Sequence, residues 1–264
     1  MARSRAQAER LRPAIRPAYR DPRLDPYAVP VGEGEDDDPL HYAPSLVARI
    51  AAVPGQELAT HTFAHVYCAE PGQTREAFAA DLAAAHEAAR PYGVPMRSIV
   101  FPRNQHNPAY DGVLREAGIT VYRGNARGWV YRPMRGAEET RGLRLARRMD
   151  AYLPVTGAQG WAWDALRPVD GLSNVPASIL LRPHQPGSAA LNALSLRRVL
   201  RAMESAARAR RVMHLWWHPH NFGADLDANL ARLRALLGTF AACRARWGMR
   251  SLTMAAAAEA AAAA

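Results

Sequence analysis

The sequence of 264 residues contains no lysine, only two cysteines and no apolar run of the length that crosses a membrane. A bilayer-spanning helix needs about 20 consecutive apolar residues, so we expect no membrane span. Cys68 and Cys243 are far apart and form no C-x-x-C pair, which indicates no disulfide framework. No apolar stretch follows the charged N-terminus, so we expect no secretory signal and a cytoplasmic location.

The charge of the chain is strongly positive, with a formal net charge of +10 and a pI near 10.4. Such a balance is found in proteins that bind nucleic acid. Here, however, all 34 basic residues are arginines, most of them are scattered, and alanine and proline are plentiful. This composition is typical of a GC-rich genome rather than of a selected basic patch, so we expect no nucleic-acid partner. Because 49% of the residues are hydrophobic, the chain can bury a large core.

The chain divides by composition into three parts. Residues 1–40 are rich in proline, arginine and aspartate and predict an irregular N-terminal arm. Residues 41–254 alternate between helical and strand patterns, and residues 255–264 form an alanine-rich tail. The expected helices cover 43–52, 74–90 and 109–117 and begin at Ser195 and Asp225; the expected strands cover 57–60, 98–101, 119–122, 212–217 and 251–254. We expect long loops over 124–194. The alternation predicts an α/β fold with a parallel sheet, either a barrel or a doubly wound sheet.

Polar side chains follow several of the expected strands directly. In parallel α/β folds the ligand site lies at the carboxyl ends of the strands. The residues at these ends are His61 and His65, Arg103, Arg123, and His218 and His220. The sequence therefore predicts a site at this edge of the sheet.

His61 and His65 are the first candidates for chemistry, because two imidazoles just past a strand end can turn toward one metal ion. Hydrolytic zinc sites combine histidine with a carboxylate and an open water position. Position 62 is threonine, which excludes the H-E-x-x-H motif of zincins. The alternative is a histidine pair that only stabilises a turn.

His218 follows a strand rich in tryptophan and precedes Pro219, which places it at the mouth of the site. There it could protonate a leaving group, and Trp217 and His220 could bind a sugar ring. The alternative is that these histidines are hydrogen-bonded to the backbone.

Two further strand ends carry polar clusters. Arg103 could orient a carboxylate or stabilise developing negative charge, unless it forms a structural ion pair. The expected ligands of substrate hydroxyls are Asn104 and Gln105 after one strand and Arg123, Asn125 and Trp129 after the next.

The order of these segments, ELATHTFAH, FPRNQ, RGN-x-x-x-W and HLWWHPHNF, resembles polysaccharide deacetylases of the NodB-homology type over roughly residues 40–254. The resemblance implies a distorted (β/α) barrel and a divalent metal, usually zinc. It also implies a hydrolase acting on carbon–nitrogen (non-peptide) bonds, which removes an N- or O-acetyl group from a sugar of a bacterial surface polysaccharide. By this resemblance His61 and His65 are metal ligands, His218 is the general acid, and Arg103 belongs to an arginine motif that is usually Arg-x-Pro.

One part of the family pattern is missing. Its first motif is a strand that ends in two aspartates, one a base and one a metal ligand, and nothing upstream of His61 fits it. Asp36–Asp38 predict a solvated loop, and the barrel is expected to be incomplete at its first strand. Either the chain starts too late, or the protein has lost the motif and binds sugar without turnover; a basic nucleic-acid-binding protein is a third hypothesis. We expect weak or absent activity from these 264 residues.

Overall fold

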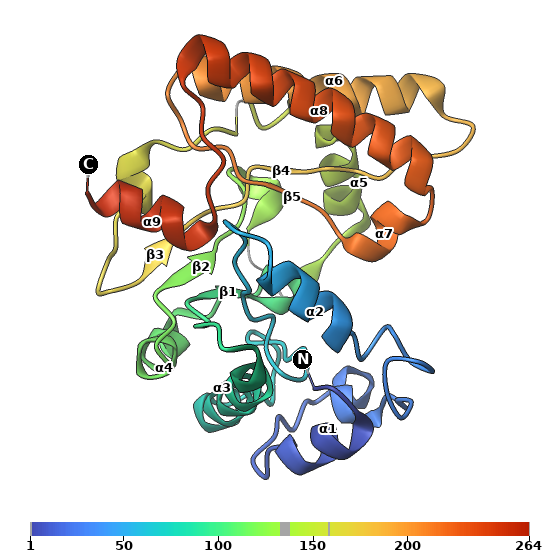
Figure 1. The fold of residues 1–264 in the computed structure, drawn as a ribbon, viewed down its shortest axis with the longest axis vertical. Coiled ribbons are helices and arrows are strands. Elements are labelled where there is room, and N and C mark those ends of the chain that lie inside the picture. The colour runs from blue at the N-terminus through green and yellow to red at the C-terminus, as the bar shows by residue number, and fades with distance from the viewer. Residues whose placement is uncertain (1, 133–137, 158, 264) are drawn as a thin grey trace.

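The computed structural model describes residues 2–132, 138–157 and 159–263, which form a mixed α/β protein that is about half helical. The α-helices, labelled in Figure 1, are α1 (Arg5–Leu11), α2 (Pro44–Ala51), α3 (Arg75–Ala89), α4 (Asp111–Glu116), α5 (Arg141–Asp150), α6 (Ala189–Arg208), α7 (Pro219–Gly223), α8 (Leu226–Trp247) and α9 (Met254–Ala262). Short 3₁₀ helices are η1 (Pro22–Leu24), η2 (Pro26–Ala28), η3 (Arg90–Tyr92), η4 (Pro102–Asn104), η5 (Pro108–Tyr110), η6 (Trp129–Tyr131) and η8 (Trp163–Leu166). None of the described helices is long and apolar enough to cross a membrane.

The strands are short and all pair in parallel. They are β1 (Ser98–Val100), β2 (Val121–Arg123), β3 (Ser173–Asn174), β4 (Ile179–Leu180) and β5 (Leu215–Trp216). One sheet has the order β1-β2-β3, and β4 pairs with β5 in a second. Thr60 adds a parallel bridge to Ile99 on the outer side of β1. The predicted α/β class with parallel strands is confirmed, and the described residues form no closed barrel.

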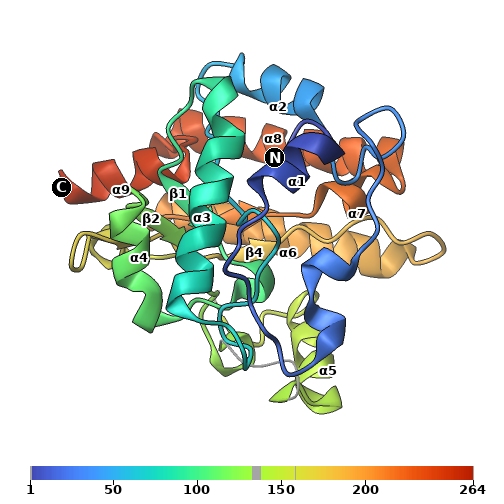
Figure 2. The ribbon, with the colours of Figure 1, turned by 90° about the horizontal axis from the view of Figure 1, so that it is seen from below.

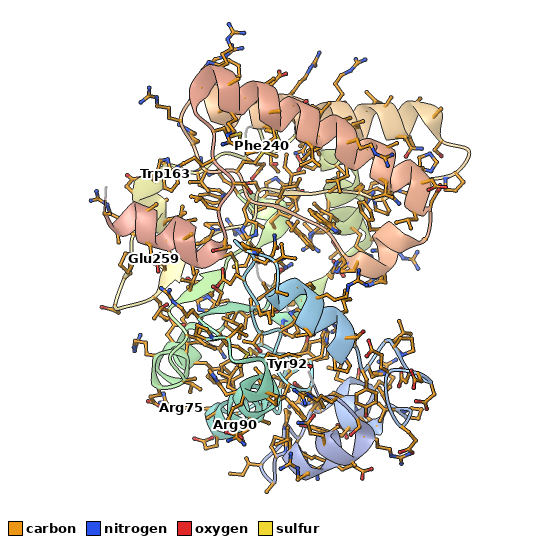
Figure 3. All side chains as sticks on the ribbon, in the orientation of Figure 1. Arg75, Arg90, Tyr92, Trp163, Phe240 and Glu259 are labelled. Atoms are coloured by element: carbon orange, nitrogen blue, oxygen red, sulfur yellow. The ribbon has the colours of Figure 1, made fainter. Side chains whose placement is uncertain are left out.

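Helices cover the two sheets separately. In one core, Phe78 and Leu82 of α3 pack with Ile99 of β1 and Leu114 of α4. In the other, α6 and α8 lie side by side over β4 and β5 (Figure 1). Figure 3 labels Phe240 on the side of α8 that faces these strands.

Local sequence signals explain where the best-predicted helices begin and end. The Thr74 hydroxyl accepts a hydrogen bond from the Ala77 N–H at the start of α3. Gly93 (φ 64°) follows η3 and Gly248 (φ 69°) follows α8, both in the left-handed conformation that glycine adopts without strain. These three predictions are confirmed.

Four predicted segments differ from the structure. The strand expected at 57–60 is reduced to the single bridge at Thr60, and 124–194 contains α5, β3 and β4 instead of loops alone. The helix expected from Ser195 begins six residues earlier, at Ala189. No strand forms at 251–254, because the Thr253 hydroxyl caps α9 by accepting the Ala256 N–H.

The two ends of the chain pack on the rest of the protein. Three alanines of α9 are buried in one cluster with Val121 and Leu166, so the boundary predicted at 254/255 falls inside a core helix rather than at the start of a tail. Ala264, the last residue of that predicted tail, lies outside the described residues. The N-terminal arm carries α1, which lies beside α3 in Figure 2. Its backbone is tied to the loop before α3 by the hydrogen bond from Ala18 N to Gly72 O, at 2.9 Å.

Candidate functional site

The loop that carries His61 and His65 follows the bridge at Thr60 and is held by polar side chains. The Asp81 carboxylate of α3 is 1% exposed and accepts the N–H groups of Phe63, at 2.7 Å, and Ala64, at 3.0 Å. These bonds fix two of the three residues that lie between the histidines. Burial raises the pKa of Asp81 to about 6, and the two N–H donors act in the opposite direction.

Two threonine hydroxyls complete the support of this loop. The Thr60 hydroxyl accepts the Thr62 N–H and the Thr62 hydroxyl accepts the Val66 N–H, both at 3.0 Å. Thr62 (φ 68°) and His65 (φ 56°) lie in the left-handed region, which is unfavourable for residues other than glycine. The surrounding hydrogen bonds therefore hold a strained backbone that turns both imidazoles to one side.

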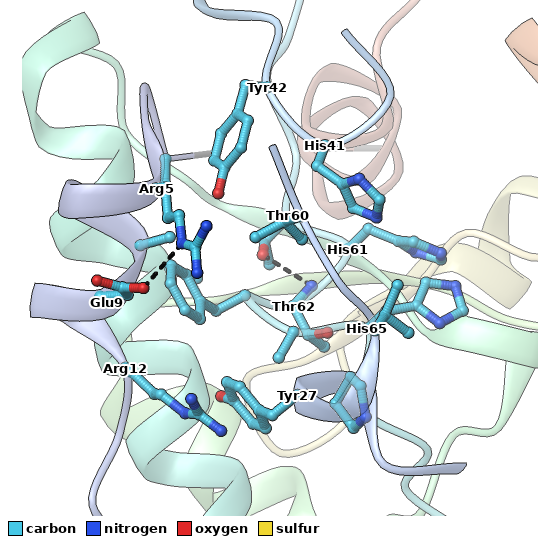
Figure 4. Close-up of a pocket in the computed structure, with 18 of the residues that line it drawn as sticks. Arg5, Glu9, Arg12, Tyr27, His41, Tyr42, Thr60, His61, Thr62 and His65 are labelled. Carbon is cyan, nitrogen blue, oxygen red and sulfur yellow. Dashed lines mark hydrogen bonds and ion pairs between the residues drawn. The ribbon is translucent and has the colours of Figure 1, made fainter. Parts of the chain in front are cut away.

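The two imidazoles lie next to each other. Their ring centroids are 4.9 Å apart with an interplanar angle of 70° (Figure 4). The His61 Nδ1–H donates to the Val100 carbonyl at 2.6 Å, which leaves its Nε2 as the acceptor nitrogen. In metal sites, the histidine nitrogen that does not bind the metal usually donates its N–H to a backbone carbonyl or a carboxylate.

Both histidines are biased toward the neutral form. Partial burial lowers the pKa of His61 to about 4, although one side of the ring opens to a cavity; the hydrogen bond to Val100 opposes this shift. Burial, and then the charge of Arg103, lowers the pKa of His65. Neutral imidazole is the form that ligates metal, so the pair is ready for a cation near pH 7.

The geometry of the pair fits two positions of a tetrahedral zinc site. Zn–N bonds of 2.0–2.1 Å at the tetrahedral angle bring two ring centroids to roughly 5 Å from each other, close to the observed separation. The described residues contain no group of three histidine, cysteine or acidic side chains that could hold a metal ion. The carboxylates of Asp37 and Asp38 bind the backbone N–H groups of their own loop. A catalytic zinc site has three protein ligands, and the pair could supply two of them.

Arg103 lies close to the histidine pair, in a loop after β1. Its guanidinium is 4.2 Å from the Tyr67 ring centroid and 3.8 Å from the buried Glu70 carboxylate. Arg103 therefore lies near enough to the histidines for its charge to act on His65, as the functional interpretation expects. It also forms the ion pair that we named as the alternative. The Gln105 amide is 1% exposed, donates to Glu70 at 2.9 Å and accepts the Ala69 N–H at 3.3 Å. Gln105 thus supports the loop, and the geometry does not present it to a substrate.

Arg123, at the end of β2, lies between the two sheets. Its Nη2 donates to the Asn104 amide oxygen at 2.8 Å, and its guanidinium lies 4.3 Å from the centroid of the Trp216 ring in β5. Arg123 and His218 both act on His61, because their positive charges lower its pKa. Arg123 thus links the end of β2 to the segment after β1 and to β5.

His218 follows β5 and lies beside the Trp216 ring, which Arg123 also contacts. Its ring contacts Trp216 edge-on at 5.3 Å and stacks on His220 at 5.3 Å. Burial lowers the pKa of His218, and the charges of His220 and Arg123 lower it further. Trp217 points to the opposite face of the strand, where it packs 6.0 Å from Phe222, so Trp216 takes the position that we predicted for Trp217.

Two other predicted ligands lie beside β2 without joining the histidines. The Asn125 amide donates to the Tyr131 carbonyl at 2.8 Å. Trp129 is 59% exposed, on η6. Neither is brought into contact with the histidine pair by any described interaction.

A cavity of about 800 Å³ opens in front of the pair (Figure 4). His61, Thr62 and His65 form one wall, and the opposite wall comes from Tyr27 and His41 in the N-terminal segment. The histidine loop is thus accessible to a ligand of substantial size.

Sequence reasoning missed three residues of this region. Asp81 has no local signal, because it lies on a helix and its contact with the loop is formed only by folding. Trp216 could have been found from the two-residue period of a strand, which puts positions 216 and 218 on the same face. His41 lies next to a proline- and aspartate-rich arm that gave no pattern, and its Nδ1 pairs with Asp38 at 2.8 Å.

Comparison with models of known protein families finds no match, and neither a curated protein nor a solved structure is significantly similar to this chain. The comparisons therefore identify no family, and what the protein does has to be argued from the site.

Proposed function

We propose that the protein is a metal-dependent hydrolase that removes an acetyl group from the nitrogen or oxygen of a sugar in a bacterial surface polysaccharide. The observation that supports this most is the ring contact between His61 and His65, directly after the parallel bridge at Thr60. The charge of His218 also acts on His61. The proposed fold is a distorted (β/α) barrel, incomplete at its first strand, of which Thr60 with β1-β2-β3 and the pair β4-β5 are the segments.

In this proposal His61 and His65 hold a divalent cation, most simply zinc. When bound, such an ion lowers the pKa of a water ligand and polarises the acetyl carbonyl. His218, as imidazolium, donates its proton to the departing amine or alkoxide oxygen of the sugar. Arg103 stabilises negative charge on the acetyl oxygen from the side of His65, since its charge already acts on that ring.

Substrate contacts in the proposal come from the polar cluster around these residues. Asn104 and Arg123 bind hydroxyl or charged groups of the sugar, and the aromatic face of Trp216 offers an apolar surface beside His218. No described carboxylate stands at the histidine pair to act as a base for water. We therefore expect slow turnover.

The experiment is acetate release from acetylated amino-sugar oligomers, measured with zinc added and with zinc removed by chelation. We expect slow, zinc-dependent release by the protein and none by the variant His65→Gln. His106→Gln is the matched control, because His106 pairs with Asp111 and does not line the cavity. Equal release by all three proteins, or release that ignores zinc, would refute the proposal.

A second candidate is a carbohydrate-binding protein without turnover. It is favoured by the lack of a third metal-binding side chain among the described residues and by the aromatic groups beside the cluster. Isothermal titration with the same oligomers separates the two candidates. Binding without acetate release, at any zinc concentration, supports the second.

A further inference from the structure

Arg123 is a partly buried cation that lies between the two sheets. It reaches from the end of β2 to Trp216 in β5, and its Nη2 donates to Asn104 in the loop after β1. The side chain therefore occupies the place where the carboxyl ends of both sheets meet, beside His61 and His218.

Arg123 forms no ion pair with any carboxylate of the described residues, and its Nε is buried without a hydrogen-bond acceptor. Burial lowers its pKa to about 10, and no acidic side chain acts against this shift. Arg198, which is more deeply buried, pairs with the buried Asp150 at 2.8 Å. A charge that is partly withdrawn from water without a charged partner is unfavourable, so the position of Arg123 is suited to an anion that arrives from outside.

The neighbours of Arg123 strengthen this preference. After burial, its positive charge contributes to the lowered pKa values of His61, His214 and His218. The buried carboxylate of Glu70 is engaged by Arg103 and Gln105. An anionic group at the cluster would meet one fixed guanidinium and several polarisable rings.

We infer that Arg123 is the anion-binding group of this site and that the sugar bound here carries a carboxylate, as a uronic acid does. Planar guanidinium matches a carboxylate in two parallel hydrogen bonds, and Trp216 gives the sugar ring an apolar face next to that contact. That the ligand is a sugar rests on the proposed function. That the ligand carries a carboxylate follows from the position of Arg123 alone. Acetate carries the same group, so the test includes it separately.

The test is binding to the full chain in the presence of a chelator, so that it does not depend on metal or on turnover. Glucuronate, glucose and acetate are titrated by calorimetry. We expect glucuronate to bind at least about tenfold more tightly than glucose and than acetate, as charge-assisted hydrogen bonds suggest. Arg123→Gln should abolish the preference for glucuronate over glucose, and Arg123→Lys should keep part of it.

Arg127→Gln is the matched control, because Arg127 also lies over a tryptophan, Trp161, at 4.6 Å but is exposed and away from the histidines. Thermal melts of each variant verify folding. Equal affinity for glucuronate and glucose, or an unchanged preference in a folded Arg123→Gln protein, overturns the inference. Acetate binding as tight as glucuronate overturns the acidic sugar as the ligand. Failure of the proposed hydrolysis appears instead as missing zinc-dependent acetate release, which is measured independently.

Discussion

The Asp81 carboxylate accepts a hydrogen bond of 2.7 Å from the Phe63 N–H and so joins α3 to the loop of the candidate site. A second bond of 3.0 Å reaches the Ala64 N–H. Since these two residues lie between His61 and His65, one buried side chain on a helix fixes the backbone that carries both imidazoles.

Replacing Asp81 should therefore affect both stability and the site. Asp81→Ala leaves two buried N–H groups without an acceptor, which lowers the free energy of unfolding by about 1–3 kcal/mol. Asp81→Asn should cost less, because its amide oxygen still accepts one bond. Urea denaturation measures this effect, with Asp227→Ala in the exposed first turn of α8 as the control. A folded Asp81→Ala protein of unchanged stability would mean that the loop is held by other contacts.

Gly124 is packed so closely that a single methyl group should destabilise the protein. A Cβ at this position would lie 2.2 Å from the Asn174 Oδ1, a buried atom of the neighbouring strand. We expect Gly124→Ala to lower the free energy of unfolding by about 1–3 kcal/mol.

The same substitution should cost much less in a protein that already carries Asn174→Ala, because the obstructing amide is gone. Gly238→Ala is the control: no atom lies within contact distance, and helix α8 should become up to about 1 kcal/mol more stable. Equal costs of Gly124→Ala in both backgrounds would show that the strain does not come from Asn174.

His214 should make the protein less stable in acid. Its Nδ1–H donates to the Val175 carbonyl at 3.1 Å, and burial lowers its pKa from 6.5 to about 4 in the folded state. The unfolded chain therefore binds the proton first, so this contribution to stability is full above pH 6.5 and is lost as the pH falls toward 4. The loss should be roughly 2–3 kcal/mol.

Denaturation of the wild type and of His214→Gln across this pH range isolates the effect as a difference between the two proteins. The difference is needed because the raised pKa of Asp81 increases the free energy of unfolding as the pH falls over part of the same range. Parallel pH dependences of the two proteins would contradict the burial of a neutral His214.

The pH dependence of acetate release tests the role of His218. Because burial and the charges of His220 and Arg123 lower its pKa below 6.5, the imidazolium fraction falls as the pH rises through the range below 6.5, and kcat should fall with it. His218→Gln should lower kcat by about 10²–10⁴. His220→Gln should move the profile to higher pH, since one of the charges that lowers the His218 pKa is removed. A profile that does not move with His220, or full activity of His218→Gln, would exclude His218 as the general acid.

Helix ends were the most predictable part of the fold. Thr74, Gly93 and Gly248 act through their own backbone or a neighbouring turn, so a short stretch of sequence contains the whole signal. The strand predicted at 251–254 does not form. Thr253 has a high strand propensity, but its hydroxyl caps a helix of alanines, and burial of that helix against Leu166 stabilises it. Propensity was overridden there by a distant contact.

The position of the site residues was predictable where they directly follow strands. It was not predictable where it depends on loop turns or on contacts between distant residues. Parallel pairing brings the ends of the Thr60 segment and of β2, with His61 and Arg123, into one sheet, whereas His218 follows β5 of the second sheet. Gln105 was assigned to substrate on the same reasoning, but a chain turn at Arg103 and Asn104, both with positive φ, points its amide into the protein. Such a turn has no reliable sequence signal when the residues are not glycine.

The most direct test is the zinc affinity of the wild type, of His61→Ala, of His65→Ala and of the double variant, measured by competition with a chelating dye. If both imidazoles hold one cation, each single variant should lose at least about tenfold in affinity, and the double variant should lose less than the sum of the two losses in free energy. Zinc binding that is unchanged in both single variants would contradict a shared cation at His61 and His65.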